Sequence, residues 1–189
     1  LVGSEMCIRD SSRQYGSGGS QVAKILAERM GVWCYDRDIL TIAAERIGNE
    51  ELTEDTINDL NYKRNDVASA GITGVMGMGN IPIYNQMFLE QAKIIRKLAN
   101  YGSAVFLGRC ADYILKDIKN CTSVYLYADR EFRKNRVKEI YGSNAEIMDK
   151  EEKNRADYYN YYTGNRWGDI NNYDFAINTS KVSFEEAAD

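Results

Sequence analysis

The sequence predicts an α/β protein in which helices flank a parallel β-sheet. Two observations carry this prediction. Short β-prone runs alternate with helical patterns along the chain, and a glycine-rich turn at residues 13–20 runs directly into an amphipathic helix. The chain has 189 residues, of which 44% are hydrophobic, and this composition supplies one buried core. We therefore expect a single domain over residues 12–189.

The turn from Arg13 to Ser20 has the features of a phosphate-binding loop. Its backbone N–H groups can converge on an anion, and the following helix N-terminus adds about half a positive charge. The P-loop pattern G-x-x-x-x-G-K-[ST] is met only in part, because Gly18 and Ser20 fit while Arg13 replaces the first glycine and Gly19 replaces the lysine. The predicted nucleotide-binding residues are Tyr15, Gly16, Ser17, Gly18, Gly19 and Ser20. Ser20 also occupies the magnesium-ligand position, although a plain helix N-cap fits it equally.

The next elements are a strand and a helix, followed by a long irregular segment. A β-prone run at 32–35 ends at Asp36, and a helix starts at 39 with Asp38 as a possible N-cap. Residues of about 49–85 are polar and then rich in glycine and methionine. We interpret this segment as a mobile insertion on the substrate side.

Two buried strands with helices between them form the middle of the chain. Helical spacing over 86–100 is closed by Gly102, and a strand at 103–107 then delivers residues 108–112 at its carboxyl end. Open α/β sheets bind their ligands at such ends. A strand at 122–128 precedes a helix whose arginines recur at a spacing of three and therefore share one face. These arginines are Arg130, Arg133 and Arg136.

The last third of the chain continues the alternation. A charged helix at 146–162 leads into a turn at 163–169, and a strand at 173–178 precedes a short helix from 183. The predicted fold is thus a parallel α/β sheet with a phosphate-binding turn and a substrate-side insertion.

Residues 1–11 do not fit this scheme. A P-loop is fed by a buried strand, yet this segment shows neither a continuous apolar run nor a clean alternation. It does not have the pattern of a signal peptide either. We expect a non-native leader that resembles translated sequencing-adapter read-through and has replaced the first strand. A genomic read that confirms these codons would contradict this expectation.

Composition excludes several classes of function. The chain contains no histidine, which removes His-based triads, His metal sites and histidine general bases. The net charge of −4 disfavours broad nucleic-acid binding but leaves small phosphate ligands plausible. No CxxC pair occurs and no apolar run reaches the roughly 20 residues that span a bilayer. We expect a reduced, cytoplasmic setting with neither nucleic acid nor membrane as a partner.

Five separated motifs, in order, resemble the cytidylate kinase-like family. They are Arg13 to Gly19, Tyr35-Asp36, the segment from Gly108 to Leu115, the segment from Ala156 to Gly164, and Tyr173-Asp174. The resemblance covers nearly all of the chain from residue 12 onward, and the family is similar to the nucleoside monophosphate kinases. The resemblance implies a P-loop NTPase-type fold with a five-stranded parallel core and a helical lid at about 140–170. It also implies transfer of the γ-phosphoryl of ATP to CMP or dCMP with Mg²⁺.

The resemblance also suggests roles for individual residues. Arg109 follows a buried strand, where a cation has little structural purpose, so it is predicted to bind the acceptor monophosphate. Cys110 stands where the family has an aspartate, which leaves recognition of the base open. The predicted substrate-binding residues are Asp36, Arg109 and Asp112, although Asp36 and Asp112 fit turn and helix caps equally. The predicted catalytic arginines are Arg109, Arg130, Arg133, Arg155 and Arg166.

Several alternatives remain at the level of sequence. The missing P-loop lysine means either that an arginine such as Arg13 substitutes for it or that the protein is slow. A non-catalytic nucleotide-binding module, or a kinase for another small acceptor, fits the same motifs. The aromatic residues near 158–167 are more typical of packing or of a homo-oligomer surface than of base stacking. Asp174 fits a strand-end cap.

Overall fold

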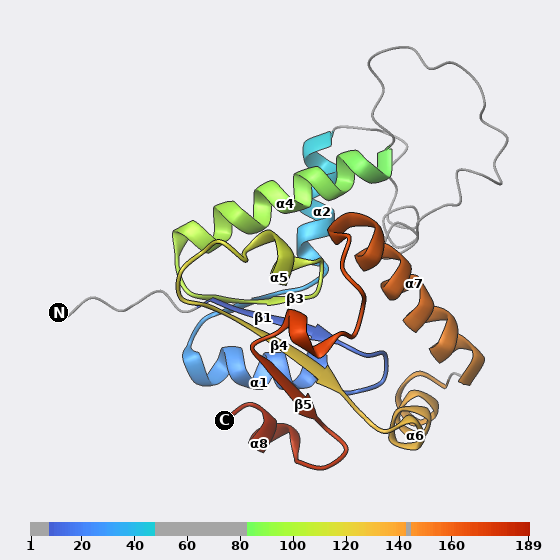
Figure 1. Cartoon of the computed structure of the whole chain (residues 1–189). Helices are drawn as coiled ribbons and strands as arrows, with labels where there is room; N and C mark the ends of the chain where they lie inside the picture. Colours follow the sequence, from blue (N-terminus) through green and yellow to red (C-terminus); the bar gives the residue numbers. More distant parts are fainter. Residues whose placement is uncertain (1–7, 48–82, 143–144) are drawn as a thin grey trace, which may run out of the picture.

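A computed structural model describes residues 8–47, 83–142 and 145–189 of the chain. Its strands are β1 (Ile8–Arg13), β2 (Trp33–Tyr35), β3 (Ala104–Leu107), β4 (Cys121–Tyr127) and β5 (Phe175–Asn178). They form one sheet in the order β2-β3-β1-β4-β5, and every neighbouring pair is parallel (Figure 1). The predicted α/β class with a parallel sheet is confirmed.

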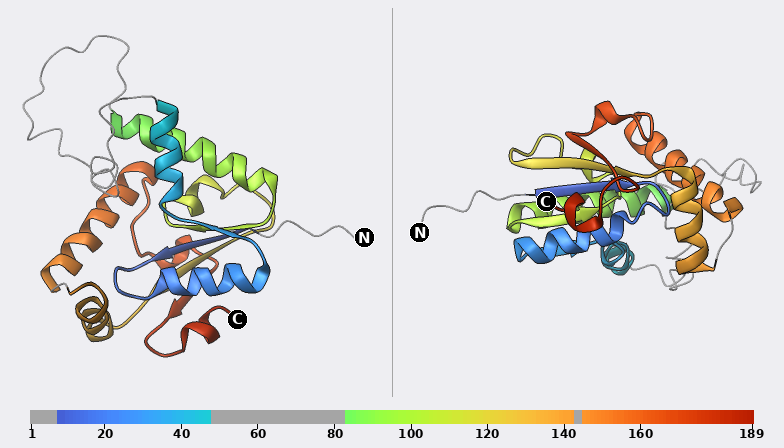
Figure 2. Two further views of the ribbon diagram at one scale, coloured as in Figure 1. Left: turned by 180° about the vertical axis from the view of Figure 1, so that it is seen from behind. Right: turned by 90° about the horizontal axis from the view of Figure 1, so that it is seen from below.

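Helices cover both faces of this sheet. They are α1 (Gly19–Met30), α2 (Asp38–Ile47), α4 (Ile83–Tyr101), α5 (Ala111–Ile114), α6 (Arg130–Tyr141), α7 (Ala145–Thr163) and α8 (Phe184–Ala187), with a 3₁₀ turn at Ile170–Asn172. Helices α1 and α8 pack together on one face, while α4 and α5 lie on the other with α2 against α4 (Figures 1 and 2). Helices α6 and α7 lie beyond the carboxyl ends of the strands, where the glycine-rich turn also lies (Figure 1).

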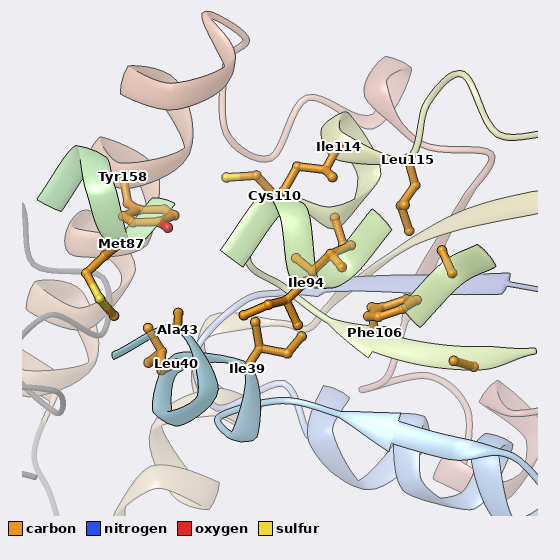
Figure 3. Packing of buried hydrophobic residues seen from close by; sticks show 14 of the residues in the cluster. Ile39, Leu40, Ala43, Met87, Ile94, Phe106, Cys110, Ile114, Leu115 and Tyr158 are labelled. Atoms are coloured by element: carbon orange, nitrogen blue, oxygen red, sulfur yellow. The ribbon is translucent and has the colours of Figure 1, made fainter. Parts of the chain in front are cut away.

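Successive side chains of β3 point to opposite faces of the sheet, so the strand contributes to two hydrophobic clusters. Phe106 belongs to the large cluster formed with α2, α4, α5 and α7 (Figure 3). Val105 and Leu107 point the other way and pack on Ala23 and Ala27 of α1. Burial of each large side chain contributes roughly 1.5–3 kcal/mol, so β3 is anchored from both faces. This anchoring holds its carboxyl end rigidly.

Strand β1 occupies the centre of the sheet, and this corrects the expectation that the first strand is missing. Its backbone pairs with β3 from Ile8 to Ser11 and with β4 from Ile8 to Arg13. This run has no apolar pattern, so the sequence does not indicate a strand. Strands β3 and β4 supply its backbone hydrogen-bond partners on both sides. Both strands lie far along the chain, so a local pattern cannot reveal the pairing.

Other expectations about the fold have mixed outcomes. The strand and helix boundaries over 32–47 and 83–189 agree with the sequence pattern to within a few residues. The expected substrate-side insertion, 49–85, falls almost entirely outside the described residues. Within the described part of the chain, every helix is too short or too polar to cross a bilayer.

Candidate functional site

The glycine-rich turn connects the end of β1 to the start of α1 and is fastened at several points. The N–H of Gln14 donates to the Leu126 carbonyl at 2.9 Å, which ties the turn to β4. Ser17 is buried, and its Oγ donates to the Gln14 carbonyl at 2.9 Å. Thr179, which follows β5, donates from its Oγ1 to the Ser17 carbonyl at 2.6 Å. The turn is therefore held in place by two neighbouring strands.

Glycine is required in this turn by space as well as by conformation. Gly16 and Gly18 both have φ near +81°, a region that other residues enter at a cost. A Cβ on Gly16 would lie 2.8 Å from Val137 Cγ2, and one on Gly18 would lie 2.4 Å from the Phe184 ring. Gly19 has no positive φ, yet its Cβ would lie 2.6 Å from Arg13 Cβ. The backbone here cannot carry side chains, as expected of a phosphate cradle.

A cavity of about 210 Å³ opens over this turn and has a positive lining. It is bounded by the glycines, by Ser20 at the start of α1, and by positive side chains from four elements, β1, α1, α6 and α7. These positive side chains are Arg13, Lys24, Arg136 and Arg155. A helix N-terminus and surrounding cations both favour an anion, so the cavity fits the phosphates of a nucleotide.

A second, much smaller cavity of about 10 Å³ lies at the carboxyl end of β3. It is lined by Arg109, which is only 2% exposed, and it shares Arg13 and Arg155 with the cavity over the glycine-rich turn. Gly108, Arg109 and Cys110 have φ of +74°, +63° and +56°. Left-handed conformations of non-glycine residues cost about 1–3 kcal/mol each and cluster at functional sites.

Arg13 and Arg155 connect the two cavities. Arg155 comes from α7, and its Nη1 donates to the Arg13 carbonyl at 2.9 Å. Its guanidinium also lies over the ring of Tyr15, 5.2 Å from the centroid. The Nη2 of Arg13 forms an ion pair with Asp36 Oδ1 at 3.3 Å. The predicted substrate-side residue Asp36 is therefore near the site and is held by a cation of the glycine-rich turn.

Asp112 does not line the smaller cavity, but it is hydrogen-bonded to Tyr159, which does. The Tyr159 hydroxyl donates to Asp112 Oδ2 at 2.5 Å, and Tyr159 itself lines that cavity. Burial raises the pKa of Asp112 above its ordinary range, and the hydrogen bond from Tyr159 opposes this rise. Burial and the nearby Asp112 carboxyl both raise the pKa of Tyr159. Asp112 lies inside the first turn of α5 rather than at its N-cap, which is Cys110.

The arginines of α6 separate, contrary to the expectation that they share one face. Arg133 is buried and donates from Nε to the Ala128 carbonyl at 3.2 Å and from Nη1 to the Tyr15 carbonyl at 3.4 Å. Arg130 points instead to α7 and forms a paired contact with Asp149. Arg136 faces the phosphate cavity. Positions six residues apart differ by about 120° around a helix, so Arg130 and Arg136 point in different directions.

The remaining predicted residues have clear positions. Arg166 is exposed on the turn after α7 and lines neither of these cavities. Tyr158 and Tyr159 are buried in the large cluster, which confirms the packing interpretation. Asp174 Oδ2 accepts from the Ser123 N–H at 2.7 Å and from its hydroxyl at 3.0 Å. Asp174 is therefore a cap that joins β5 to β4.

Glu152 of α7 is a site residue that the sequence did not reveal. Its Oε2 accepts from the Tyr15 N–H at 2.7 Å, and its Oε1 accepts from Trp167 Nε1 at 2.9 Å. Glu152 and Arg155 are three residues apart and therefore neighbours on the helix. The spacing in the sequence indicates that Glu152 and Arg155 share a face of α7. It does not indicate that this face meets the glycine-rich turn.

The donor set suits Mg²⁺ only together with a phosphate ligand. Among the described residues, no group of three or more His, Cys, Asp or Glu side chains converges on a point that could hold a metal. Ser20 lies at the beginning of α1 and lines the phosphate cavity. In P-loop proteins Mg²⁺ is held by substrate phosphates together with the Ser or Thr of the loop, and Ser20 occupies that position of the pattern.

Comparisons with known proteins identify the family and the fold of the chain. A model of the cytidylate kinase-like family matches residues 11–181. No curated protein matches the chain in sequence. A solved structure of an uncharacterized protein from Eubacterium ventriosum is 29% identical, with a TM-score of 0.70 over 96% of this chain and 93% of that one.

Two more distant solved structures are small-molecule kinases. The APS kinase of Mycobacterium tuberculosis, in complex with AMPPNP and APS, is 15% identical, with a TM-score of 0.52 over 98% of this chain and 95% of that one. A shikimate kinase from Acinetobacter baumannii, in complex with shikimate, is 14% identical, with a TM-score of 0.52 over 96% and 89%. At these identities the likeness shows a shared P-loop kinase fold.

Proposed function

The chain belongs to the cytidylate kinase-like family, and from this membership we propose that it transfers the γ-phosphoryl of ATP to CMP or dCMP. The observation that carries the proposal is the positively lined cavity of about 210 Å³ over the glycine cradle, with the buried Arg109 beside it at the end of β3. Arg13 and Arg155 lie next to both the cradle and Arg109. Phosphoryl transfer requires a donor and an acceptor phosphate side by side.

The donor half of the site is formed by backbone atoms and Ser20. The turn at 13–20 binds the phosphates through its amides, and Ser20 supplies a hydroxyl ligand for Mg²⁺. A Mg²⁺ ion held by the Ser20 hydroxyl would neutralise part of the charge on the donor phosphates. Arg136 lies on the rim, where its Nη2 donates to Gln21 Oε1 at 2.7 Å and its guanidinium lies 4.9 Å from the centre of the Phe184 ring.

The acceptor half is centred on Arg109. Its guanidinium binds the phosphate of the nucleoside monophosphate, because a planar fork of donors matches phosphate geometry. Asp36 offers a carboxylate on the neighbouring strand end for sugar or base groups. Asp112 acts indirectly by holding the hydroxyl of Tyr159. These roles follow from position at the carboxyl edge of the sheet.

Catalysis in this proposal is alignment and charge neutralisation, so the absence of histidine is no obstacle. Arg155 lines both cavities and reaches the transferring group, while Arg133 holds the Tyr15 carbonyl and so orients the turn. Arg130 and Arg166 lie on the lid side, and they join the site only when the lid closes over it. Closure of the lid excludes water from the transferring phosphoryl group.

An acceptor screen tests the proposal. ADP release is measured with CMP, dCMP, UMP and AMP as acceptors, and turnover is expected with CMP or dCMP. Arg109→Ala should raise the KM for the acceptor by at least roughly tenfold with little change in ATP affinity, since one charge-assisted contact is worth about 1.5–3 kcal/mol. Arg46→Ala, which alters an exposed arginine in the last turn of α2, is the matched control. Unchanged acceptor affinity in Arg109→Ala would contradict the assignment.

A non-catalytic nucleotide-binding module is the second candidate. Gly19 in the lysine position favours it, because loss of a central cation costs such enzymes much of their rate. Binding of ATP without turnover of any acceptor would support the module. Turnover with another small phosphate acceptor, but not with CMP or dCMP, would keep the kinase chemistry and change the substrate.

A further inference from the structure

The two residues that depart from the P-loop pattern contact each other in space. Arg13 stands where the first glycine is expected, and Gly19 stands where the lysine is expected. A Cβ built on Gly19 would lie 2.6 Å from Arg13 Cβ and 2.9 Å from Arg13 Cγ. The stem of Arg13 therefore fills the volume from which a lysine side chain at position 19 would start. The two departures are one structural exchange.

We propose that Arg13 is the phosphate-binding cation of this turn and replaces the missing lysine by a reciprocal exchange of glycine and cation. The inference rests on the proposed function, and it assigns the residue that contacts the β- and γ-phosphates of the donor. In the usual pattern the cation comes from the first turn of the helix. In this protein it comes from the last residue of the central strand, and the helix carries the glycine.

The surroundings of Arg13 agree with this role. Its side chain is 8% exposed and lines the phosphate cavity together with Gly18, Gly19 and Ser20. It also lines the cavity of Arg109, so it lies where donor and acceptor phosphates meet. Asp36 Oδ1 forms an ion pair with its Nη2 at 3.3 Å, and a guanidinium presents a planar fork of N–H donors that matches phosphate geometry.

Other cations near the turn suit the role less well. Lys24 is exposed and lies more than one helical turn beyond Gly19. Arg136 donates to Gln21 and lies over the Phe184 ring, at the rim. Arg155 belongs to α7, whereas Arg13 ends the central strand, where its backbone pairs with β4 and its side chain with Asp36. A cation positioned in this way loses less freedom when it binds a phosphate.

A cycle of four proteins tests the exchange: wild type, R13G, G19K and R13G/G19K. The double variant restores G-x-x-x-x-G-K-S, because Gly18 and Ser20 are already present. The readouts are the affinity for Mg-AMPPNP relative to Mg-ADP, the thermal midpoint of unfolding and the turnover. AMPPNP and ADP differ at the γ-phosphoryl group, so their affinity ratio reports on a cation at that group without any acceptor.

The exchange predicts strong coupling between the two positions. R13G should lose the preference for Mg-AMPPNP at least roughly tenfold and turnover by roughly 10³- to 10⁵-fold, as for other phosphate-neutralising arginines. G19K should unfold at a lower temperature than wild type, because its Cβ meets Arg13 Cβ. The double variant should regain the AMPPNP preference and turnover to within about tenfold of wild type, and it should be more stable than G19K.

A matched control separates this effect from a general effect of lysine. Gly102→Lys introduces the same side chain at a glycine whose Cβ would meet no atom within 4 Å, and it should leave all three readouts unchanged. The proposal is wrong if R13G keeps the wild-type preference for AMPPNP, or if the double variant is no better than the poorer single variant.

The outcomes also separate this inference from the proposed function. If wild type turns over no acceptor while the AMPPNP preference follows the cycle, the kinase assignment fails and the assignment of Arg13 is supported. If turnover occurs but the affinity ratio does not follow the cycle, the kinase assignment is supported and the exchange is overturned. If wild type binds neither nucleotide, both are overturned.

Discussion

At the scale of single residues, the site is marked by unusual backbone conformations. Gly108, Arg109 and Cys110 are consecutive left-handed residues at the end of β3, and Gly16 and Gly18 have the same sign of φ in the glycine-rich turn. Such conformations persist only where the surrounding structure enforces them. Here the buried strand and its neighbours do so, and the strain presents Arg109 and the turn amides to the same edge of the sheet.

Gly16→Ala should destabilise the protein more than a matched substitution elsewhere. Both Gly16 and Gly142 have a positive φ, but a Cβ on Gly142 meets no atom within 4 Å, whereas one on Gly16 meets Val137 Cγ2 at 2.8 Å and the Arg133 carbonyl at 3.0 Å. Gly142→Ala should cost about 1–2 kcal/mol from conformation alone, and Gly16→Ala roughly 1–3 kcal/mol more. Urea unfolding of both variants measures the difference. Equal losses would contradict the described packing of the turn.

Asp112 should make stability depend on pH. Its native pKa is raised, chiefly by burial, so the native state binds more protons than the unfolded state over a window that starts near the ordinary aspartate value of about 3.9. The free energy of unfolding should therefore fall as pH rises through that window. Asp112→Asn removes this titration while an amide oxygen can still accept from Tyr159.

Urea unfolding of wild type and Asp112→Asn across this pH window measures that effect, and the variant should gain stability relative to wild type as pH rises. Asp149→Asn is a control of opposite sign, because a hydrogen bond from Arg130 lowers the pKa of Asp149. The stability that the Asp149 carboxylate contributes is present above the ordinary aspartate pKa, and it is lost as pH falls through the lowered pKa of Asp149. A pH dependence unchanged by Asp112→Asn would show that Asp112 is not the titrating group.

At the scale of elements, α7 is the helix that joins the site to the core. Its carboxyl half packs in the large cluster through Tyr158 and Tyr159. The ring of Tyr162 stacks on that of Phe88 of α4, with 4.0 Å between the ring centroids. Glu152 and Arg155, in the middle of the helix, reach the glycine-rich turn. Helix α7 therefore connects the large cluster to the glycine-rich turn.

Glu152→Ala should loosen the contact between α7 and the turn. It removes the acceptor of the Tyr15 N–H and of Trp167 Nε1, and loss of such partners costs about 1–3 kcal/mol. Asp149→Ala, on the same helix but at the exposed pair with Arg130, should cost less. Urea unfolding measures the stability of both variants, and tryptophan emission in a Trp33→Phe background reports on the environment of Trp167 alone. An equal loss in the two variants would argue against Glu152 as the connecting residue.

At the scale of the whole molecule, the parallel sheet places every part of the site. Asp36, the glycine-rich turn and Arg109 follow β2, β1 and β3, which are neighbours in the sheet. Parallel strands end at the same edge, so residues far apart in sequence meet there. Strand β1 is essential to this arrangement because it lies between β3 and β4.

A proline should therefore be far more harmful in β1 than in β2. Asp10 is paired on both sides, with Phe106 and Ser123, while Cys34 of the edge strand is paired with Val105 alone. Asp10→Pro should lower the free energy of unfolding by about 3 kcal/mol or more, and Cys34→Pro by less, because prolines are tolerated chiefly at sheet edges. Thermal unfolding followed by circular dichroism measures both. A harmless Asp10→Pro would show that residues 8–13 are not the central strand.

Much of the architecture and part of the site could be predicted before any coordinates. Helical spacing at 86–100, the β-prone run at 103–107 and the glycine-rich turn are local patterns, and local patterns encode local structure. Arg109 was identifiable for the same reason, as a cation directly after a buried strand. The roles of Arg130, Arg136 and Glu152 were not identifiable, because the direction of a helical side chain depends on how the helix packs.

The sequence by itself thus determined the order of the elements, the parallel α/β class and the position of the glycine-rich turn. Only the tertiary structure decided that residues 8–13 form the central strand, that Arg13 fills the space beside Gly19, and which arginines line the cavities. The physical reason is the range of the interactions. Turns and periodic faces depend on residues a few positions apart, whereas strand pairing and the meeting of side chains depend on segments more than a hundred residues apart in places.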